Sequence, residues 1–242
     1  SELSFNYPNF QSVEDITFQG GASPRNETLQ LTPTDSNGIP IRQRAGHAVY
    51  SQPFQLRDTS FYTTFTFVIR TTSNSPADGF AIFIAPPDFP VKRYGGYLGL
   101  FEPNTATNTS ANKVVAVEFD TWVNTEWKEP RYRHIGIDVN SIVSVRVTRW
   151  QDKDVFSRSI ATAHVGYDGI SKILTAFVTY PDGGNYVLSH VVDLAEIFPG
   201  DVRIGFSGAT GQYETQYIHS WSFSSTSTNL LRDGARHHHH HH

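Results

Sequence analysis

The stretch VVAVEFDTWVN, residues 114–124, predicts a β-strand with two very different faces. Its β-branched and aromatic residues are typical of strands, in which successive side chains point to opposite sides. The odd-numbered positions suit a hydrophobic core: Val115, Val117, Phe119 and Thr121. The even-numbered positions carry a polar set with one large aromatic: Glu118, Asp120, Trp122 and Asn124. Two carboxylates this close repel each other, so a proton, a cation or a basic side chain must neutralise them.

The same alternation recurs along the chain and predicts an all-β fold. Further strands are expected at residues 61–69, 143–148 and around 221–223, with turns at Asn37-Gly38, Asp168-Gly169 and Asp182-Gly183. The only helix expected is the short DLAEIF segment at 193–198, and strand character is lost after about Phe223. Many short strands with regular turns are typical of an antiparallel β-sandwich of two packed sheets.

Composition indicates one domain and excludes several classes of partner. Residues 237–242 are a histidine tag, which leaves a single domain over residues 1–236. The chain has 19 basic and 23 acidic side chains and no basic block, so neither nucleic acid nor membrane insertion is expected. Cysteine is absent, and the two glycosylation sequons at Asn26 and Asn108 favour a secretory origin.

A compact set of candidate metal ligands begins in the stretch 114–124 and continues beyond it. The following loop, TEWKEPRYRH, supplies Glu129, and His134 opens the next strand. Carboxylates with an amide suit calcium, whereas carboxylates with one histidine suit manganese or a similar ion. An acidic edge with a surface histidine remains the alternative interpretation. The candidate ligands are Glu118, Asp120, Asn124, Glu129 and His134.

A glycoside hydrolase is a second class to weigh, because some jelly-roll β-glucanases place two carboxylates at alternate positions of one strand. Glu118 and Asp120 have that spacing. A retaining hydrolase needs a second acid about 5 to 5.5 Å from the nucleophile, which in those enzymes follows two residues later. Trp122 occupies that place here, so hydrolysis is disfavoured.

Three further segments carry small or isolated polar residues. In PADGFAIFIAPPD (76–88), Asp78 stands alone at the start of a very apolar strand, where capping a turn is the simpler interpretation. YGGYLGLF (94–101) predicts a glycine-rich turn into a strand, and without a lysine or a following helix it is no phosphate loop. SGATGQYET (207–215) predicts a loop of small residues.

Taken in order, the motifs ADGFAIFIAPPD, GGYLGLF, VAVEFDT, HIGIDVNSI, VRIGFSGATG and SWSF resemble those of the legume (L-type) lectins. The resemblance spans nearly the whole chain and is strongest to galactose-type seed lectins of the Bauhinia kind. It implies a concanavalin A-like jelly roll with a flat back sheet and a curved front sheet. It also implies a non-catalytic sugar site on loops above the front sheet, held in place by a calcium ion and a transition-metal ion such as manganese.

The resemblance assigns roles to the candidate ligands. The transition-metal ligands would be Glu118, Asp120 and His134, and the calcium ligands would be Asp120, Asn124 and the Trp122 carbonyl. An acid that contacts both ions normally lies in Trp-Asp-Pro. This chain instead reads Trp-Lys-Glu-Pro over residues 127–130, one residue longer, so Glu129 is assigned that role.

The resemblance also implies a set of sugar-binding residues. Asp78 would follow a cis peptide bond and accept hydrogen bonds from two sugar hydroxyls. Asn124 and the Gly96 N–H would donate hydrogen bonds to the sugar, and Trp122 would offer it an apolar face. The remaining expected members lie after Thr210: Gly211, Gln212 and Tyr213.

Two features point to different sugars. A broad aromatic such as Trp122 favours galactose or N-acetylgalactosamine, whereas a short loop over 211–215 is typical of the mannose/glucose binders. We expect a lectin for terminal galactose or N-acetylgalactosamine on glycoproteins or glycolipids, with mannose/glucose as the alternative. The resemblance further implies a homodimer or homotetramer formed through back-sheet edges, and a location in a seed storage vacuole or outside the cell.

Overall fold

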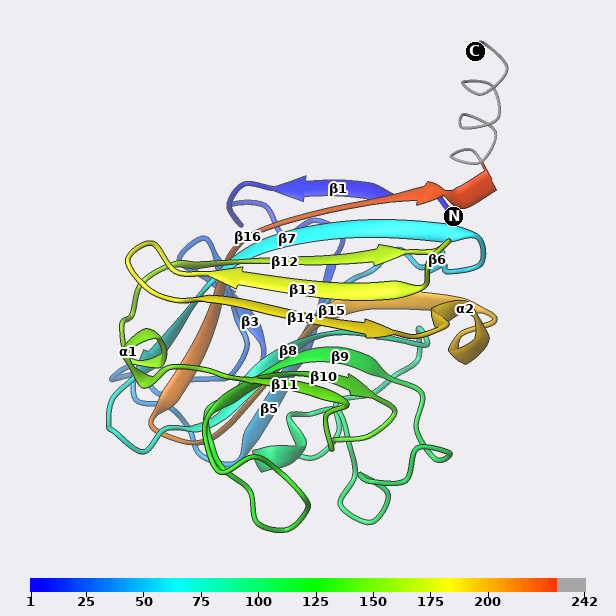
Figure 1. The fold of residues 1–242 in the computed structure, drawn as a ribbon. Helices are drawn as coiled ribbons and strands as arrows, with labels where there is room; N and C mark the ends of the chain where they lie inside the picture. The colour runs from blue at the N-terminus through cyan, green and yellow to red at the C-terminus, as the bar shows by residue number, and fades with distance from the viewer. Residues whose placement is uncertain (230–242) are drawn as a thin grey trace.

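The computed structural model describes residues 1–229 and shows two antiparallel sheets packed face to face (Figure 1). The predicted antiparallel β-sandwich is therefore confirmed. No helix within these residues is long and apolar enough to cross a membrane. The expected domain end at 236 and the tag at 237–242 lie outside the described residues.

One sheet, called the back sheet here, has the strand order β14-β13-β12-β7-β16-β4-β3, with β1 also paired to β16. Strands β7, β12 and β13 of this sheet run across the upper half of Figure 1. Their bounds are β1 Ser4–Tyr7, β3 Ser23–Arg25, β4 Thr28–Gln30, β7 Thr59–Thr71, β12 Ala161–Asp168, β13 Ile173–Thr179, β14 Asn185–Val191 and β16 Glu214–Ser227.

The other sheet, called the front sheet, has the order β11-β10-β9-β8-β15-β5-β2, with β6 also paired to β15. One of its interior strands, β9, comes from the stretch 114–124. The bounds are β2 Ile16–Gly20, β5 Arg44–Tyr50, β6 Phe54–Gln55, β8 Ala77–Ala85, β9 Val115–Asp120, β10 His134–Val139, β11 Arg146–Arg149 and β15 Asp201–Gln212.

The predicted faces of β9 are confirmed. Val115, Val117 and Phe119 lie in the main core between the sheets, where the Phe119 ring stacks on Phe80 with centroids 4.5 Å apart. The opposite face of the front sheet is also covered, because loop residues such as Leu100 pack there in a second apolar cluster. The polar residues of β9 are therefore buried beneath loops rather than exposed to solvent.

Two expected strands are shorter than the sequence pattern suggested. The first ends at Asp120 rather than 124, because the Trp122 N–H donates to Asp120 Oδ1 at 2.9 Å and turns the chain. The strand expected at 143–148 is β11, Arg146–Arg149. Before it, the Val143 N–H bonds to the Ser141 hydroxyl at 3.1 Å instead of a neighbouring strand.

Two expected loops are strands. Residues 207–212 continue β15, which pairs with β8 and β5, so only Tyr213 (φ 55°) separates β15 from β16. Strand β16 runs to Ser227 rather than fading after Phe223, because it pairs with β7 throughout. The buried Ser225 there accepts a hydrogen bond from the Leu3 N–H at 2.8 Å, so a serine-rich run satisfies its polar groups within the sheet.

The helix expected at 193–198 is confirmed as α2, Leu194–Ile197, capped by the Asp193 carboxylate. A second short helix, α1 at Asp152–Val155, was not expected. The prediction that residues 94–101 form a turn leading into a strand is wrong, because Gly95–Tyr97 forms a 3₁₀ turn followed by irregular chain.

Two side chains of the front sheet hold this glycine-rich loop. The ring of His47 on β5 is fully buried, and its Nε2–H donates to the Gly99 carbonyl at 2.9 Å. The Ser207 hydroxyl on β15 donates to the Leu98 carbonyl at 2.5 Å. Burial lowers the pKa of His47 to about 4, so the ring is neutral in the folded protein.

His47 therefore makes stability depend on pH. An unfolded histidine takes up a proton near pH 6.5, whereas folded His47 resists it until about pH 4. Stability contributed by the neutral ring is present above pH 6.5 and lost as pH falls toward 4, at a cost of about 3 kcal/mol. In urea titrations between these pH values, wild type should lose about that much more unfolding free energy than His47→Gln. The half-buried His164 gives the matched control, His164→Gln, which should follow wild type; parallel curves for wild type and His47→Gln would contradict the assignment.

Candidate functional site

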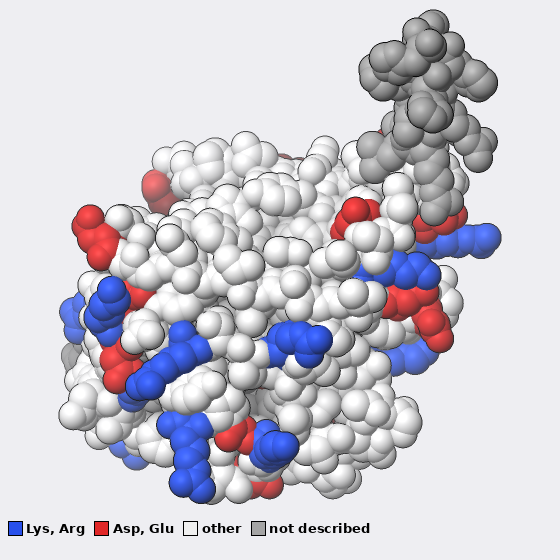
Figure 2. All heavy atoms as spheres, viewed as in Figure 1, with Lys and Arg blue, Asp and Glu red and all other residues white. Residues whose placement is uncertain are grey.

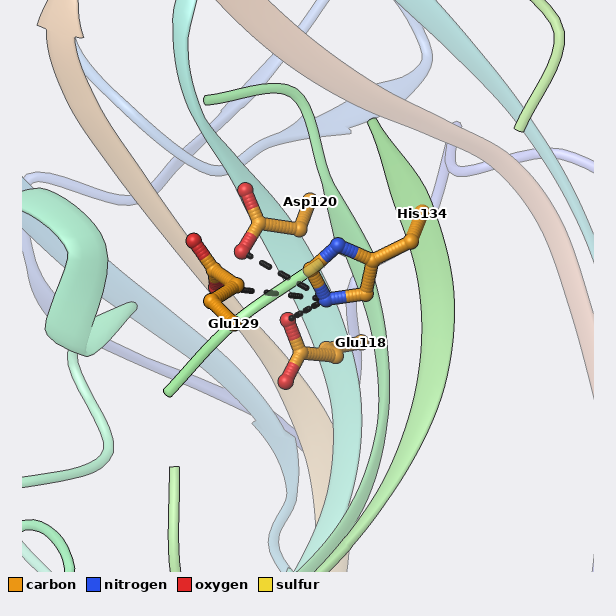
Figure 3. A group of neighbouring side chains, drawn as sticks. All are labelled: Glu118, Asp120, Glu129 and His134. Atoms are coloured by element: carbon orange, nitrogen blue, oxygen red, sulfur yellow. Dashed lines mark ion pairs between the residues drawn. The ribbon is translucent and has the colours of Figure 1, made fainter. Parts of the chain in front are cut away.

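Four titratable side chains converge beside the front sheet (Figure 3). Glu118 and Asp120 project from β9, His134 opens β10, and Glu129 comes from the intervening loop. His134 Nε2 lies 3.3 Å from Glu118 Oε2, 3.8 Å from Asp120 Oδ2 and 3.9 Å from Glu129 Oε1. One donor atom from each residue lies within 4.8 Å of all the others, so a single ion can contact all four.

The sheet register explains why the sequence brings these groups together. Glu118 and Asp120 point to the same side because strand side chains alternate. His134 pairs directly with Asp120 across β9 and β10. On the other side, the β8 partner of Asp120 is Gly79, and a Cβ there would lie 2.0 Å from the Phe119 carbonyl oxygen. A glycine is therefore required for β8 to approach the carboxylate strand this closely.

The oxygens that face the cluster have no hydrogen-bond partner among residues 1–229, although they are buried. Buried polar atoms are nearly always paired, so several orphans in one place indicate a missing cation. Three carboxylates and an imidazole suit a transition-metal ion, while Asp120, Asn124 and Glu129 offer the all-oxygen set that calcium prefers. The orphaned oxygens are Glu118 Oε2, Asp120 Oδ2, Asn124 Oδ1 and Glu129 Oε1.

The titration behaviour of the cluster reflects the same crowding. Burial, together with the charges of Glu118 and Glu129, raises the pKa of Asp120 well above its usual range. Burial also opposes ionisation of Glu118, but the adjacent His134 ring outweighs it and lowers the pKa of Glu118. His134 has a raised pKa, because Glu118 overcomes the effect of burial. The carboxylates cannot all stay charged unless a cation joins them.

A fourth acid, Asp138, supports the cluster from behind. The Ser144 hydroxyl lies 2.9 Å from Glu118 Oε1 and 2.6 Å from Asp138 Oδ1, so it bridges the two acids. Burial and the charge of Glu118 raise the pKa of Asp138 well above its usual range. The Ser144 hydroxyl, held between the two acids, helps to orient Glu118.

An open pocket of about 360 Å³ lies next to the cluster. It contains six of the seven sugar-binding residues expected from the resemblance: Asp78, Gly96, Trp122, Asn124, Gly211 and Gln212. Tyr213 does not line this pocket, and its ring lies instead beside the Arg42 guanidinium at 5.5 Å. Gln212 lines it, but its side-chain amide is bound to the Ser75 carbonyl at 2.8 Å.

Asp78 forms the floor of the pocket. It is only 4% exposed, its Oδ2 has no hydrogen-bond partner among the described residues, and the Ala77–Asp78 peptide bond is cis as expected. Burial and the charge of Glu214 raise the pKa of Asp78 to about 8. Gly211 stands so close that a Cβ there would lie 2.8 Å from Asp78 Oδ2, which keeps the carboxyl accessible to a ligand.

Asn124 belongs to both the cluster and the pocket. Its backbone N–H donates to Glu129 of the cluster, and its Oδ1 is buried without a hydrogen-bond partner among the described residues. Its Nδ2 points into the pocket and donates to Glu126 Oε2 at 3.3 Å. A Cβ on Gly96 would lie 2.3 Å from this Nδ2, so only glycine lets the two loops meet.

Sequence reasoning missed five side chains that line the pocket: Gln43, Arg93, Tyr94, Tyr97 and Glu126. Glu126 follows Asn124 by two residues in the loop between β9 and β10, called the metal-ligand loop here (residues 121–133). That closeness to a predicted site residue could have indicated Glu126 as a pocket residue. The Tyr97 and Trp127 rings contact each other at a tilt, with centroids 5.0 Å apart, and so join the glycine-rich loop to the metal-ligand loop. Gln43 comes from a distant part of the chain, and no local signal pointed to it.

Both predicted glycosylation asparagines are exposed. Asn26 lies in the turn between β3 and β4, and Asn108 lies in the loop before β9. Either position can accept a glycan without disturbing the sheets or the pocket.

Comparison with known proteins agrees with this geometry. Residues 2–237 match the legume lectin domain. Lectin-4 of Griffonia simplicifolia is 53% identical over 93% of this chain and 96% of its own length. A mannose/glucose-specific lectin of Centrolobium tomentosum is 45% identical over 93% of this chain and 96% of its own length.

Solved structures show the same likeness. Lectin I-B4 of Griffonia simplicifolia, in a metal-free form, has a TM-score of 0.90 and 55% identity over 93% of this chain and 99% of that chain. Lectin UEA-II, solved in complex with galactose, has a TM-score of 0.83 and 34% identity over 93% of this chain and all of that chain (100%). With its sandwich, its buried acidic cluster and its adjoining pocket, this chain belongs to the legume lectin family, whose members bind carbohydrates and are not enzymes.

Proposed function

We propose that this lectin binds terminal galactose or N-acetylgalactosamine on glycans, in a pocket ordered by a calcium ion and a transition-metal ion such as manganese. The observation that carries the proposal is Asn124, whose backbone N–H donates to Glu129 of the cation cluster while its side chain lines the pocket with a buried, unpaired Oδ1. A cation that fixes Oδ1 also fixes the direction of the amide N–H. The cluster would then act by positioning, with no chemical step.

In this proposal the sugar is held by one buried acceptor, two donors and an apolar platform. Asp78 accepts hydrogen bonds from sugar hydroxyls, while Asn124 Nδ2 and the Gly96 N–H donate hydrogen bonds to sugar oxygens. The Trp122 ring, 39% exposed at the pocket wall, offers a flat surface to the C–H face of the sugar. Galactose suits this platform because its axial 4-hydroxyl leaves one face apolar.

Mannose or glucose is the second candidate. A relative that is 45% identical is named mannose/glucose-specific, and in this chain a single residue, Tyr213, separates β15 from β16 beside the pocket. Tyr213 would influence the choice between these sugars only from the rim of the pocket, because its ring lies against Arg42 rather than in the pocket.

The exposed sequons support passage through the secretory pathway, toward a seed storage vacuole or the cell exterior. We also propose a homodimer or homotetramer that contacts through the back sheet. Strand β14 is the edge of that sheet and presents Val187 and Val191, which are 61% and 67% exposed. An apolar sheet edge with free backbone groups favours pairing with another strand.

Removal of the ions should lower both stability and sugar affinity. An ion present at about 100 times its dissociation constant adds about 2.7 kcal/mol, which raises the melting temperature by about 5 to 10 °C in a domain of this size. Calorimetry of chelated protein before and after calcium and manganese addition measures this shift. Glu118→Gln should abolish the shift caused by manganese, while Glu196→Gln, an exposed acid on α2, should behave as wild type. Equal melting temperatures with and without ions would refute the metal assignment.

Asp78→Asn should abolish detectable sugar binding. The substitution replaces one acceptor oxygen of the carboxyl group by an NH₂ donor, and loss of two hydrogen bonds from sugar hydroxyls weakens binding by about 3 kcal/mol, roughly a hundredfold. Titration calorimetry with methyl galactoside, N-acetylgalactosamine and methyl mannoside measures both affinity and selectivity. Glu196→Gln again serves as the control. Binding of mannoside but not galactoside by the wild type would replace the first sugar assignment with the second.

Self-association should depend on β14. Light scattering of the wild type should give at least twice the monomer mass of 27.1 kDa. A double variant, Val187→Asp with Val191→Asp, should be monomeric and still bind sugar, because charges on an edge strand prevent pairing. Val145→Asp, at an exposed valine just before β11 and away from the back sheet, is the matched control. A monomeric wild type, or an unchanged mass in the double variant, would exclude this interface.

A further inference from the structure

A second open pocket, of about 290 Å³, adjoins the sugar pocket. Trp122 lines both, so its indole forms the wall between them. The second pocket is built from the turn after β9, the chain entering β10, the end of β11 and the start of α1. Its other lining residues are Thr121, Val123, Arg131, Tyr132, Arg133, Arg149 and Asp152.

One of the three arginines has a structural role. Arg133 donates from Nε to the Thr121 carbonyl at 2.9 Å and from Nη2 to the Asn74 carbonyl at 3.1 Å. Its Nη1 pairs with Asp152 at 3.2 Å. Arg133 therefore fixes the turn that carries Trp122 and neutralises the one acid of this pocket.

The other two arginines have no acidic partner in the described part of the chain. Arg131 and Arg149 are exposed, and no carboxylate of residues 1–229 lies within 4.0 Å of either guanidinium. The Arg149 guanidinium lies 5.5 Å from the centre of the Tyr132 ring, which limits its freedom. Figure 2 shows Lys and Arg side chains gathered over β11 and the loops beside it.

The two sides of Trp122 thus differ in charge. The sugar pocket contains the carboxyl groups of Asp78 and Glu126 with one arginine, Arg93. The second pocket has two uncompensated guanidinium groups. A ligand that reaches across Trp122 is therefore best matched when its neutral end lies on the first side and an anionic group lies on the second.

We propose that the second pocket is a subsite for an anionic group of the glycan, a carboxylate or a sulfate ester, linked to the sugar in the main pocket. Guanidinium groups match both anions because their planar fork donates two parallel hydrogen bonds. The subsite rests on the proposed sugar-binding function of the main pocket and adds a preference for acidic glycans to it.

Titration calorimetry with matched ligands tests the subsite. Lactose is compared with lactose sulfated at O3 or O6 of galactose and with lactose sialylated at the same positions, and methyl mannoside with its 6-sulfate. At least one anionic ligand should bind the wild type about three- to tenfold tighter than its neutral parent, as expected of one or two partly exposed charged pairs. The sulfated and sialylated arms show which anion is preferred. The preference should shrink as sodium chloride rises from about 0.05 to about 0.5 M.

Arg131→Gln and Arg149→Gln should each reduce this affinity ratio, and together bring it to about one. Arg146→Gln is the matched control, since Arg146 lies on the same strand as Arg149 but does not line the pocket. An equal affinity for neutral and anionic ligands in the wild type, or a ratio that survives the double substitution, overturns the subsite while leaving the main pocket intact. If the wild type binds none of the neutral parent sugars, the proposed function is overturned, and the subsite with it.

Discussion

Repulsion among buried carboxylates is the constraint on which the binding region depends. Glu118, Asp120 and Glu129 place oxygens within 4.8 Å of one another and of His134, under loops that exclude water. Charges that close in a low dielectric are tolerable only with a cation or with protons on some of them. The sheets that position these groups are rigid, so the cluster cannot relieve its repulsion by spreading apart. A cluster of ligands that suits a metal ion is therefore built into the packing of the front sheet.

The cluster and the pocket are coupled through very few groups. Asn124 is the direct link, because its backbone N–H donates to Glu129 of the cluster and its side chain lines the pocket. The glycine-rich loop is the second element, and it is held from beneath by hydrogen bonds from His47 and Ser207. Gly96 then approaches Asn124 closely enough to exclude any side chain. Order in the pocket thus comes from the sheet on one side and from the metal-ligand loop on the other.

Trp122 lines both pockets, and in the proposals above it influences which glycans are selected. It follows the acidic strand directly, and the turn that presents it is fixed by Asp120 on one side and by Arg133 on the other. Acidic groups predominate in the sugar pocket and basic groups in the neighbouring pocket. A single indole can therefore serve as the apolar platform for one sugar and as the boundary of a subsite for the next.

Much of the fold and most of the cluster were predictable from local sequence, because strand periodicity and metal-ligand chemistry act over short distances. The stretch from 114 to 120 alone indicated a strand with a core face and an acidic face, and Glu129 and His134 follow close behind it. Local sequence failed where pairing partners decide the outcome: β15 extends to Gln212 and β16 to Ser227 because neighbouring strands satisfy their backbone groups. It also failed where remote segments converge, as with Gln43 in the sugar pocket and Arg149 beside Arg131. The sequence by itself determined which residues could bind a cation and which face would be buried. Only the tertiary structure decided which charges meet across Trp122, because that depends on sheet register and loop packing rather than on spacing along the chain.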